Sequence, residues 1–415
     1  HFMRQIIKKN ISIKNISLIF LSLYISTLFI FNYNVRLNFI SEMFFIISFG
    51  TSLLAFIGEK KFKFEFPHLF ITLFFLFSAI SILWSTDQAV AFSHNITLFQ
   101  LYLLLLLVYH SIDNIDDLNL IIKSIFIGGI LMSIYAFILY GLDGIINAIG
   151  EGYRLGGEVN QENSFGLYSA VTFFIGLYIA MFNKKKRYYI YILLPAIFIF
   201  LSGSRKAILI FIICLPIFFI FNSRKHIFIK TFVLYFFVIF FIYLTMNSTN
   251  LPPFLNRLDI LLEGLFRDGE LDDSSSTRID MIRFGIQLFK EKPLFGYGAS
   301  QYGIHYLHHF GEFRPPHNNY IDLLVSYGLI YFIIYYSTVM YFLYTLTKKY
   351  IKSGYSIYIL FSLMMILFII NDFTSQSNTF KLFYIFLGLL FALFKKNTNK
   401  YRISEMKRGG GITLK

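Results

Sequence analysis

Apolar stretches of membrane-spanning length recur along this chain, and they constrain its fold more than any other feature. A helix needs about 20 consecutive apolar residues to cross the hydrocarbon core of a bilayer. Such runs return from one end of the sequence to the other. Only 14% of the 415 residues are charged, against about 25% in a soluble domain. Since the alternation over about ten residues typical of an outer-membrane barrel is absent, we predict an all-α polytopic membrane protein.

The apolar runs predict about twelve transmembrane helices and one large polar loop that contains short helices. Residues 1–246 hold nine spans with short loops, residues 247–322 form the loop, and residues 323–415 hold three spans and a basic tail. The single cysteine, Cys214, excludes an intrachain disulfide. The predicted spans are 16–33, 37–57, 67–84, 89–110, 118–141, 164–182, 188–203, 206–222, 227–246, 323–346, 355–371 and 379–395.

The distribution of Lys and Arg predicts the orientation, because cytoplasmic loops carry an excess of these residues. With the N-terminus inside, the basic segments "RQIIKKN", "EKKFK", "NKKKRYY", "TKKYIK" and the C-terminal tail all face the cytoplasm. Both termini are then cytoplasmic, and the loop 247–322 lies at the periplasmic or extracellular face. This bias accounts for most of the +14 net charge. It predicts contact with anionic membrane lipids and gives no indication of nucleic acid.

Two arginines in the short outer segments are candidates for binding an anion. Arg205 follows an apolar run in "LSGSRKAILIF". A charge near the hydrocarbon is costly and is therefore a functional candidate by default. The alternative is that it snorkels to the interface, like its neighbour Lys206. Arg154 lies in the glycine-rich segment "EGYRLGGEVNQENSFG", where its planar fork could hold a phosphate. It could instead pair with Glu151 or Glu158 and only order the loop.

A helix that begins after "DDSSST" in the large loop carries two further arginines. We expect the segment before it to cap the helix, which places Arg278 in the first turn, where the helix dipole disfavours a cation. Arg278 is therefore a candidate for a ligand anion, with an ordinary solvated arginine as the alternative. Arg283 is a weaker candidate for substrate binding, and an ordinary solvated arginine is the favoured alternative for it. The apolar stripe predicted for this helix is Ile279, Ile282, Ile286 and Phe289.

His317 is the candidate general base. It follows two prolines in "RPPHNNYIDLL", at the mouth of the next span, where a neutral imidazole could accept a proton. A satisfied polar histidine is the alternative. Asn318 and Tyr320, in the same motif, are candidate substrate-binding residues. Asp372, at another outer span end, could orient a donor sugar, pair with an arginine or simply cap a polar turn.

The sequence offers little for a metal or a cofactor. His305, His308 and His309 form H-x-x-H-H, but this lacks the H-E-x-x-H pattern of zinc proteases and has no well-spaced carboxylate. No Asp-x-Asp, nucleotide-binding loop or Gly-x-Ser-x-Gly elbow is present. We therefore expect neither a metal ion nor a cofactor.

Taken together, the polar motifs resemble the O-antigen ligase/polymerase superfamily. The segment "YRLGGEVNQENSFGLYSA", then "GSRKAIL", then "TRIDMIRFGIQLFKEKPLFGYGASQYG" and then "PPHNNYIDLLVSYGLIYF" occur in the order and topology of that family. The resemblance covers residues 150–345, and the first five spans agree only in hydropathy. It implies an inner-membrane, metal-independent glycosyltransferase of the GT-C type. Its donor would be a glycan on undecaprenyl pyrophosphate, presented at the periplasmic face.

By motif, the resemblance assigns catalytic roles to Arg205, Arg278 and His317. The arginines would stabilise charge on the departing pyrophosphate. His317 would take the acceptor's proton, and direct attack would invert the anomeric centre. The implied partners are the lipid-linked donor, a glycan or lipid-linked glycan acceptor, and a chain-length regulator protein.

The form of the motifs favours a polymerase of repeat units, for O-antigen or capsule, over a ligase that transfers the glycan to lipid A-core. The alternative from another class is a lipid-linked oligosaccharide flippase or other transporter. That class predicts two similar halves and charges deep inside spans. Lys123 is the only Lys or Arg well inside a predicted span.

Overall fold

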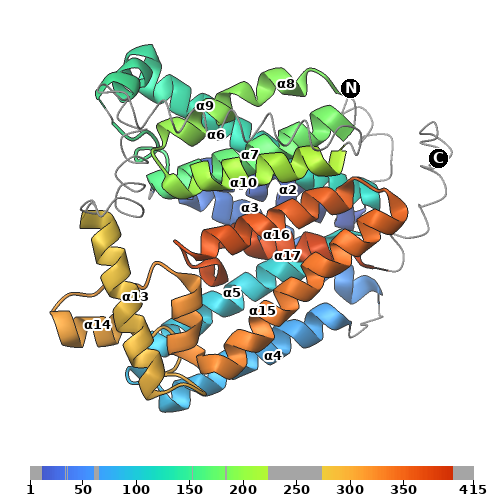
Figure 1. Cartoon of the computed structure of the whole chain (residues 1–415). Coiled ribbons are helices and arrows are strands. Elements are labelled where there is room, and N and C mark those ends of the chain that lie inside the picture. Colours follow the sequence, from blue (N-terminus) through green and yellow to red (C-terminus); the bar gives the residue numbers. More distant parts are fainter. Residues whose placement is uncertain are drawn as a thin grey trace. The chain divides into compact units, whose positions relative to one another are not determined.

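The structure is a computed structural model that describes residues 12–32, 34, 36–59, 65–151, 153–182, 185–222 and 273–395 (Figure 1). Within these residues every regular element is a helix, which confirms the all-α prediction. The chain divides into two compact units. Unit 1 comprises residues 1–73, 99–132 and 381–415, and unit 2 comprises residues 74–98 and 133–380.

Seven of the described helices are long and apolar enough to cross a membrane, and three shorter apolar segments accompany them. Together they coincide with ten of the predicted spans. The predicted span 206–222 corresponds to α10 (Arg205–Asn222), and 227–246 lies outside the described residues. The count of twelve therefore stays a prediction, as does the side of the membrane on which each loop lies.

Small residues hold the helices of unit 1 together. Ser17 and Ser48 each donate a hydrogen bond to the other's carbonyl, both at 2.9 Å, and Gly128 approaches the backbone of Ser26 too closely to admit a Cβ atom. Such small-residue contacts are typical of helix packing in membranes. The unit contains α2 (Ile13–Phe31), α3 (Asn38–Glu59), the start of α4 (Phe66–Ile80), the end of α5 (Gln88–Ser111), the start of α6 (Ile115–Glu151) and α17 (Lys381–Leu393).

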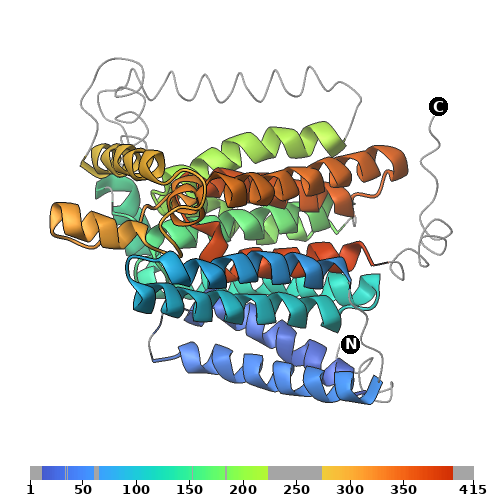
Figure 2. The same cartoon turned by 90° about the horizontal axis from the view of Figure 1, so that it is seen from below.

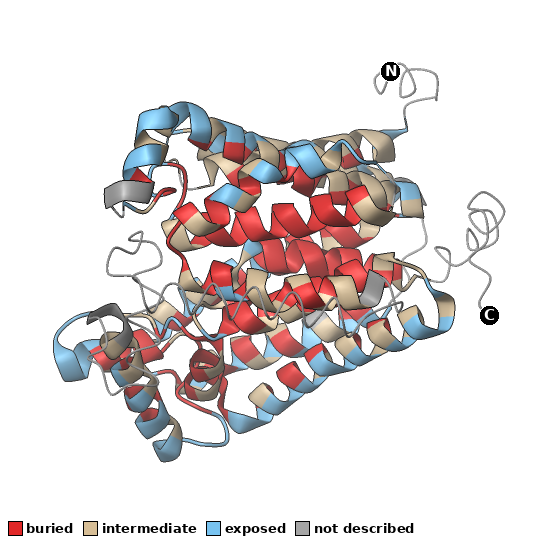
Figure 3. Ribbon diagram, turned by 45° about the horizontal axis from the view of Figure 1, so that its top comes forward, coloured by how far each residue is buried: buried red, intermediate tan, exposed pale blue. Residues whose placement is uncertain are grey.

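Unit 2 is built around α7 (Glu162–Phe182), which is buried without interruption from Ser164 to Ala180. Figure 3 shows that many other helices carry buried and exposed faces instead. Its neighbours α9, α10 and α16 pack directly on it. The remaining elements are the end of α4, η1 (Ser81–Trp84), the start of α5, the end of α6, α8 (Tyr188–Tyr191), α9 (Leu193–Leu201), α13 (Asp273–Glu291), α14 (Tyr302–Phe310), α15 (Asn319–Ser353), α16 (Ile357–Asp372) and η2 (Ser377–Thr379).

A kink in α15 receives the segment that follows α13. Gly328 has φ +75°, and a Cβ atom on it would lie 2.2 Å from the carbonyl oxygen of Leu294. The interrupted helix leaves carbonyls without intrahelical partners, and those of Val325 and Ser326 accept from the backbone N–H of Tyr297 and Gly298, both at 2.8 Å. The kink therefore fixes the loop segment on the membrane-length helix.

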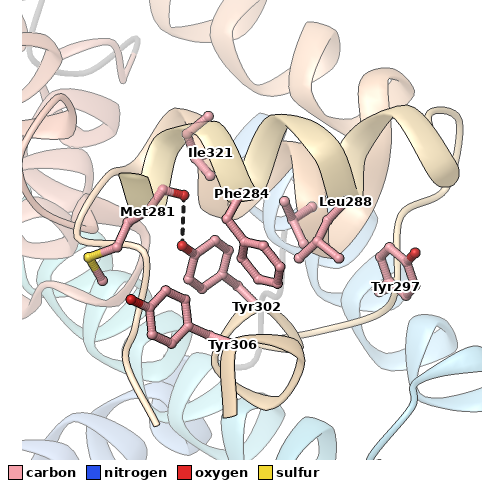
Figure 4. Close-up of a cluster of buried hydrophobic side chains, with 8 residues drawn as sticks. Met281, Phe284, Leu288, Tyr297, Tyr302, Tyr306 and Ile321 are labelled. Atoms are coloured by element: carbon pink, nitrogen blue, oxygen red, sulfur yellow. Dashed lines mark hydrogen bonds between the residues drawn. The ribbon is translucent and has the colours of Figure 1, made fainter. Parts of the chain in front are cut away.

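A hydrophobic cluster joins α13, α14 and α15, and α13 and α14 lie side by side in two views (Figure 1, Figure 2). Tyr302 donates from its hydroxyl to the carbonyl of Met281 at 2.7 Å, as drawn in Figure 4. This packing confirms that the polar loop contains helices and holds α13 against the start of α15. The cluster is formed by Met281, Phe284, Leu288, Tyr297, Tyr302, Tyr306, Ile321 and Val325.

Two local predictions for α13 need correction. The buried face carries Met281, Phe284 and Leu288; of the predicted stripe, Ile282 packs against this face, whereas Ile286 is 41% exposed. Both sets have helical spacing, and Gly285 decides between them because Ile321 contacts the space where its Cβ would be. The helix also begins at Asp273, so Arg278 lies in its second turn and not in the first.

Candidate functional site

The turn between α9 and α10 forms a tightly packed support for the first polar side chains. Gly203 has φ +58°, a left-handed conformation that glycine adopts at little cost. A Cβ atom on Gly166 of α7 would lie 2.5 Å from Ser202 Oγ. The backbone N–H of Leu155 donates to the carbonyl of Leu201 at 2.9 Å. The glycine-rich segment after α6 is therefore fixed to this turn.

Arg154 contributes to the same contact. Its Nε donates to the carbonyl of Ser202 at 3.0 Å, and its Nη2 donates to Asn163 Oδ1 at 2.9 Å. These bonds go to neutral oxygens and not to Glu158, and the side chain of Glu151 lies outside the described part of the chain. The guanidinium group is thus oriented by the α9–α10 turn.

Arg205 is the first residue of α10, and it is partly buried. Lys206, only 7% exposed, is the more deeply buried of the two cations. Its Nζ donates to Asn371 Oδ1 at 2.8 Å and to Ser375 Oγ at 2.6 Å. Lys206 therefore does not snorkel, and it connects the start of α10 to the end of α16.

The start of α15 is bound to the same end of α16. Asn318 is the N-cap of α15, accepting from the backbone N–H of Ile321 at 3.0 Å, and its Nδ2 donates to the carbonyl of Phe373 at 3.1 Å. Tyr320 donates to the carbonyl of Ile369 at 3.0 Å. Both candidate substrate-binding residues thus anchor the motif that carries His317.

Asp372 is buried at this junction, at 3% exposure. Its Oδ2 accepts from the Tyr336 hydroxyl at 2.9 Å and from Asn319 Nδ2 at 3.3 Å. Of the roles predicted for Asp372, these partners favour the structural one. The end of α16 therefore joins α10 and α15 through buried polar side chains.

His317 lies directly before the Asn318 cap, and its ring is exposed to solvent. Its φ of +46° lies in the left-handed region, which costs a residue with a side chain about 1–2 kcal/mol. Such strain persists where the surrounding structure holds it, and it gathers at functional sites. The preceding Pro316 is buried. The backbone therefore places His317 at the surface, directly before the polar junction between α15 and α16.

Positive charges surround this imidazole. Partial desolvation by the protein around it is the main cause that lowers the pKa of His317 below its ordinary value of 6.5, and the charges of Arg278, Lys206 and Arg314 lower it further. Arg278 also interacts electrostatically with Lys206. Three elements thus bring Arg278, Lys206 and His317 into one electrostatic neighbourhood. The ring stays neutral near pH 7 and can accept a proton.

Arg283 lies apart from this group. Its Nη1 is 3.2 Å from Asp280 Oδ1, and the two side chains are 73% and 65% exposed. An exposed pair of this kind contributes about 0–1 kcal/mol. The geometry of Arg283 is that of a solvated helix residue, which was the favoured alternative for it.

The histidines of H-x-x-H-H are dispersed on α14. His305 Nε2 lies 3.0 Å from Thr86 Oγ1, and His309 packs on the ring of Phe284. Among the described residues no group of three or more His, Cys, Asp or Glu side chains is placed to hold a metal ion. What this arrangement offers chemically is a set of cations beside an accessible, neutral base.

Sequence reasoning missed Lys206, Asn371 and Ser375. The dipeptide Arg205–Lys206 gave no sign of which cation is buried, because its hydrogen-bond partners lie about 165 residues further along the chain. The polar run "NDFTSQSN" after the eleventh predicted span was the available signal. Only its Asp372 was selected from that run.

Comparison with known proteins supports the resemblance noted above. Residues 190–336 match the model of the family described as O-antigen ligase, which supports assignment to the O-antigen ligase/polymerase superfamily. The match includes Arg205, Arg278 and His317, while Arg154 and Asp372 lie outside it. No curated protein matches the chain.

Proposed function

We propose that unit 2 transfers a glycan from a lipid-linked pyrophosphate donor to a hydroxyl group of an acceptor glycan. The observation that carries this proposal is the neighbourhood of His317, where an exposed imidazole with a lowered pKa lies within the field of Arg278 and Lys206. A leaving pyrophosphate needs fixed cations, and an attacking hydroxyl needs a neutral base. The family match, to proteins described as O-antigen ligase, supports the same reaction class.

In the proposed step His317 accepts the proton of the acceptor hydroxyl while its oxygen attacks the anomeric carbon. The bond between that carbon and the pyrophosphate oxygen breaks, and the lipid pyrophosphate leaves with the bonding electrons. Arg278 and Arg205 stabilise the developing negative charge through charge-assisted hydrogen bonds. Attack opposite the leaving group inverts the anomeric configuration.

Lys206 and Arg154 have supporting roles in this proposal. Lys206 lies in the field of Arg278 and adds a positive charge on the α10 side of the site. Arg154 is held by the Ser202 carbonyl, three residues before Arg205, and adds another guanidinium group there. Asp372, Asn318 and Tyr320 keep the ends of α15 and α16 together, so they position His317.

The acceptor that we propose is a second lipid-linked repeat unit, which makes the chain a polymerase. The sequence form "KPLFGYGASQYG…PPHNNY" is the feature that favours it. The alternative is a ligase that transfers the finished glycan to lipid A-core, and the printed description of the matching family favours this alternative. Both activities use the same donor and differ in the acceptor.

One experiment separates the two reactions. The purified full chain is given an undecaprenyl-pyrophosphate-linked repeat unit, with and without lipid A-core, and the products are sized by gel electrophoresis. A polymerase builds a ladder of lipid-linked products in the absence of core. Transfer that occurs only when core is present identifies the ligase. The His317→Gln variant is the control for background transfer, and product formation by this variant at the wild-type rate would refute the proposed base.

A further inference from the structure

Unit 1 contains a cavity of about 380 Å³ whose lining comes entirely from its own residues. Its walls are mainly apolar and include Phe49 of α3 with Leu103 and Leu106 of α5. One end is polar, with Lys14, His110 and Lys395. A volume in the range of about 300–1,000 Å³ with few polar groups is typical of small-molecule sites. The lining is amphipathic, so it suits a ligand with an apolar tail and a polar head.

The polar end contains two fixed ammonium groups. Lys14 forms an ion pair with Asp113. Lys395 donates to the carbonyl of Ile112 at 2.7 Å and lies 4.0 Å from the centre of the Tyr109 ring. Its amine is thereby held at the carboxyl end of α5. Both cations are positioned by the protein before any ligand arrives.

An adjacent histidine pair joins α4 to α5 beside these cations. His68 Nδ1 accepts from the backbone N–H of Glu65 at 3.1 Å, so in the neutral ring the proton is on Nε2. That nitrogen is 3.1 Å from His110 Nε2 and donates to it. The pair therefore adds polar side chains to the cationic end of the cavity.

Basic residues follow or precede the cavity-lining lysines and His68 along the sequence. Three segments adjoin Lys14, Glu65 and Lys395 along the chain, namely residues 1–11, 60–64 and 396–402, and they contain no acidic residue. These segments lie outside the described residues. Basic clusters next to membrane helices in a sequence are typical of proteins that bind anionic lipid headgroups. The cations are Arg4, Lys8, Lys9, Lys60, Lys61, Lys63, Lys396, Lys400 and Arg402.

We propose that this cavity binds one anionic glycerophospholipid, with an acyl chain against the leucines of α5 and the phosphate at Lys14 and Lys395. A free phosphate would leave the apolar wall unused. A zwitterionic lipid would bring an ammonium group to an end of the cavity that is already cationic. The site belongs to unit 1, so its test does not depend on the reaction proposed for unit 2.

Native mass spectrometry of the purified full chain, with added phosphatidylglycerol, tests this site. We expect the wild type to retain one lipid. Leu106→Trp fills the apolar part, and Lys14→Gln removes a cation and leaves Asp113 to repel the phosphate. Each should raise the dissociation constant for the lipid, measured by titration, about tenfold, the effect of losing about 1.4 kcal/mol of binding free energy. Lys348→Gln is the matched control, because Lys348 is exposed on α15 and predicted to face the same side; it should retain the lipid.

Three outcomes would overturn the proposal. The first is equal lipid retention by the wild type and both cavity variants. The second is equal retention of phosphatidylethanolamine, which would remove the requirement for an anionic head. The third is displacement of the lipid by inorganic phosphate at millimolar concentration, which would identify a soluble anion as the ligand. If one cavity variant fails to elute as a single species, the other variant still tests the proposal, because the two change opposite parts of the cavity.

Discussion

Lys206 Nζ lies 2.8 Å from Asn371 Oδ1, and this hydrogen bond connects the first turn of α10 to the last turn of α16. Ser375 accepts from the same amine. A buried ammonium group is costly unless it is paired, and this one has two neutral partners. Its neighbour Arg205 is the arginine that the motif resemblance predicts to be catalytic. The two adjacent cations thus differ in position: Lys206 is buried inside the fold, and Arg205 is the partly buried first residue of α10.

Substitutions of Lys206 should separate the contribution of its charge to catalysis from the contribution of its hydrogen bonds to stability. In Lys206→Gln an amide can still donate to Asn371, so we expect nearly unchanged thermal unfolding but a loss of glycan extension of about 10²-fold, the scale of one lost electrostatic contact. Lys206→Met should lose activity too and also about 1–3 kcal/mol of stability, because the oxygens of Asn371 and Ser375 stay buried without their donor. Full chain extension by Lys206→Gln would reduce Lys206 to a structural role.

Glycan transfer should be insensitive to metal chelation. The proposed site uses guanidinium and ammonium groups where many glycosyltransferases place a divalent cation beside the leaving pyrophosphate. We therefore expect the rate with excess EDTA to equal the rate without it. The rate is measured with the purified chain and a lipid-linked repeat unit. A loss of activity that Mg²⁺ or Mn²⁺ restores would show that a metal takes part, and it would direct attention to carboxylates outside the described residues.

The kink of α15 predicts a strong difference between two glycine substitutions. Gly328→Ala puts a Cβ atom 2.2 Å from the Leu294 carbonyl in a positive-φ extended conformation that is essentially restricted to glycine, so the expected destabilisation is at least about 1–3 kcal/mol from the backbone alone. Gly50 of α3 has no atom within 4 Å of an added Cβ. Gly50→Ala should therefore be neutral or stabilising by about 0.5–1 kcal/mol. Thermal unfolding of both variants in the same detergent tests this, and equal midpoints would contradict it.

How far the sequence predicts this molecule depends on the range of the interaction. Hydropathy, a property of each segment alone, predicted the helical fold and ten spans now covered by apolar helices. The two prolines before His317 predicted a restricted backbone, and the backbone of His317 is in the left-handed region, with φ +46°. These features needed no knowledge of distant residues.

Features that depend on distant partners were missed. The choice between the two apolar faces of α13 is made by Ile321, which packs against Gly285. The burial of Lys206 is decided by Asn371 on another helix. Arg278 was selected because of an expected place in the first turn of α13, and that local reason was wrong. Its electrostatic contact with His317 comes instead from the cluster that holds α13 on α15.

The electrostatic effect of Arg278 on His317 predicts a coupled pH dependence. Because the pKa of His317 is lowered from 6.5, the ring becomes protonated only below that pH, and the acid limb of the rate profile should lie there. Arg278→Gln removes a positive charge that opposes protonation. We expect this variant to lose about 10²–10³-fold in rate and its residual activity to have an acid limb shifted to higher pH.

The matched control is Lys290→Gln, which removes the same charge from the exposed end of α13. It should keep both the wild-type rate and the wild-type profile. Carbethoxylation of His317 by diethyl pyrocarbonate, which reacts with the neutral ring, provides a second readout that does not require activity. Its pH midpoint should rise in Arg278→Gln and stay in place in Lys290→Gln. An unchanged midpoint in Arg278→Gln would mean that Arg278 does not act on this imidazole, and the proposed pairing of base and cation would fail.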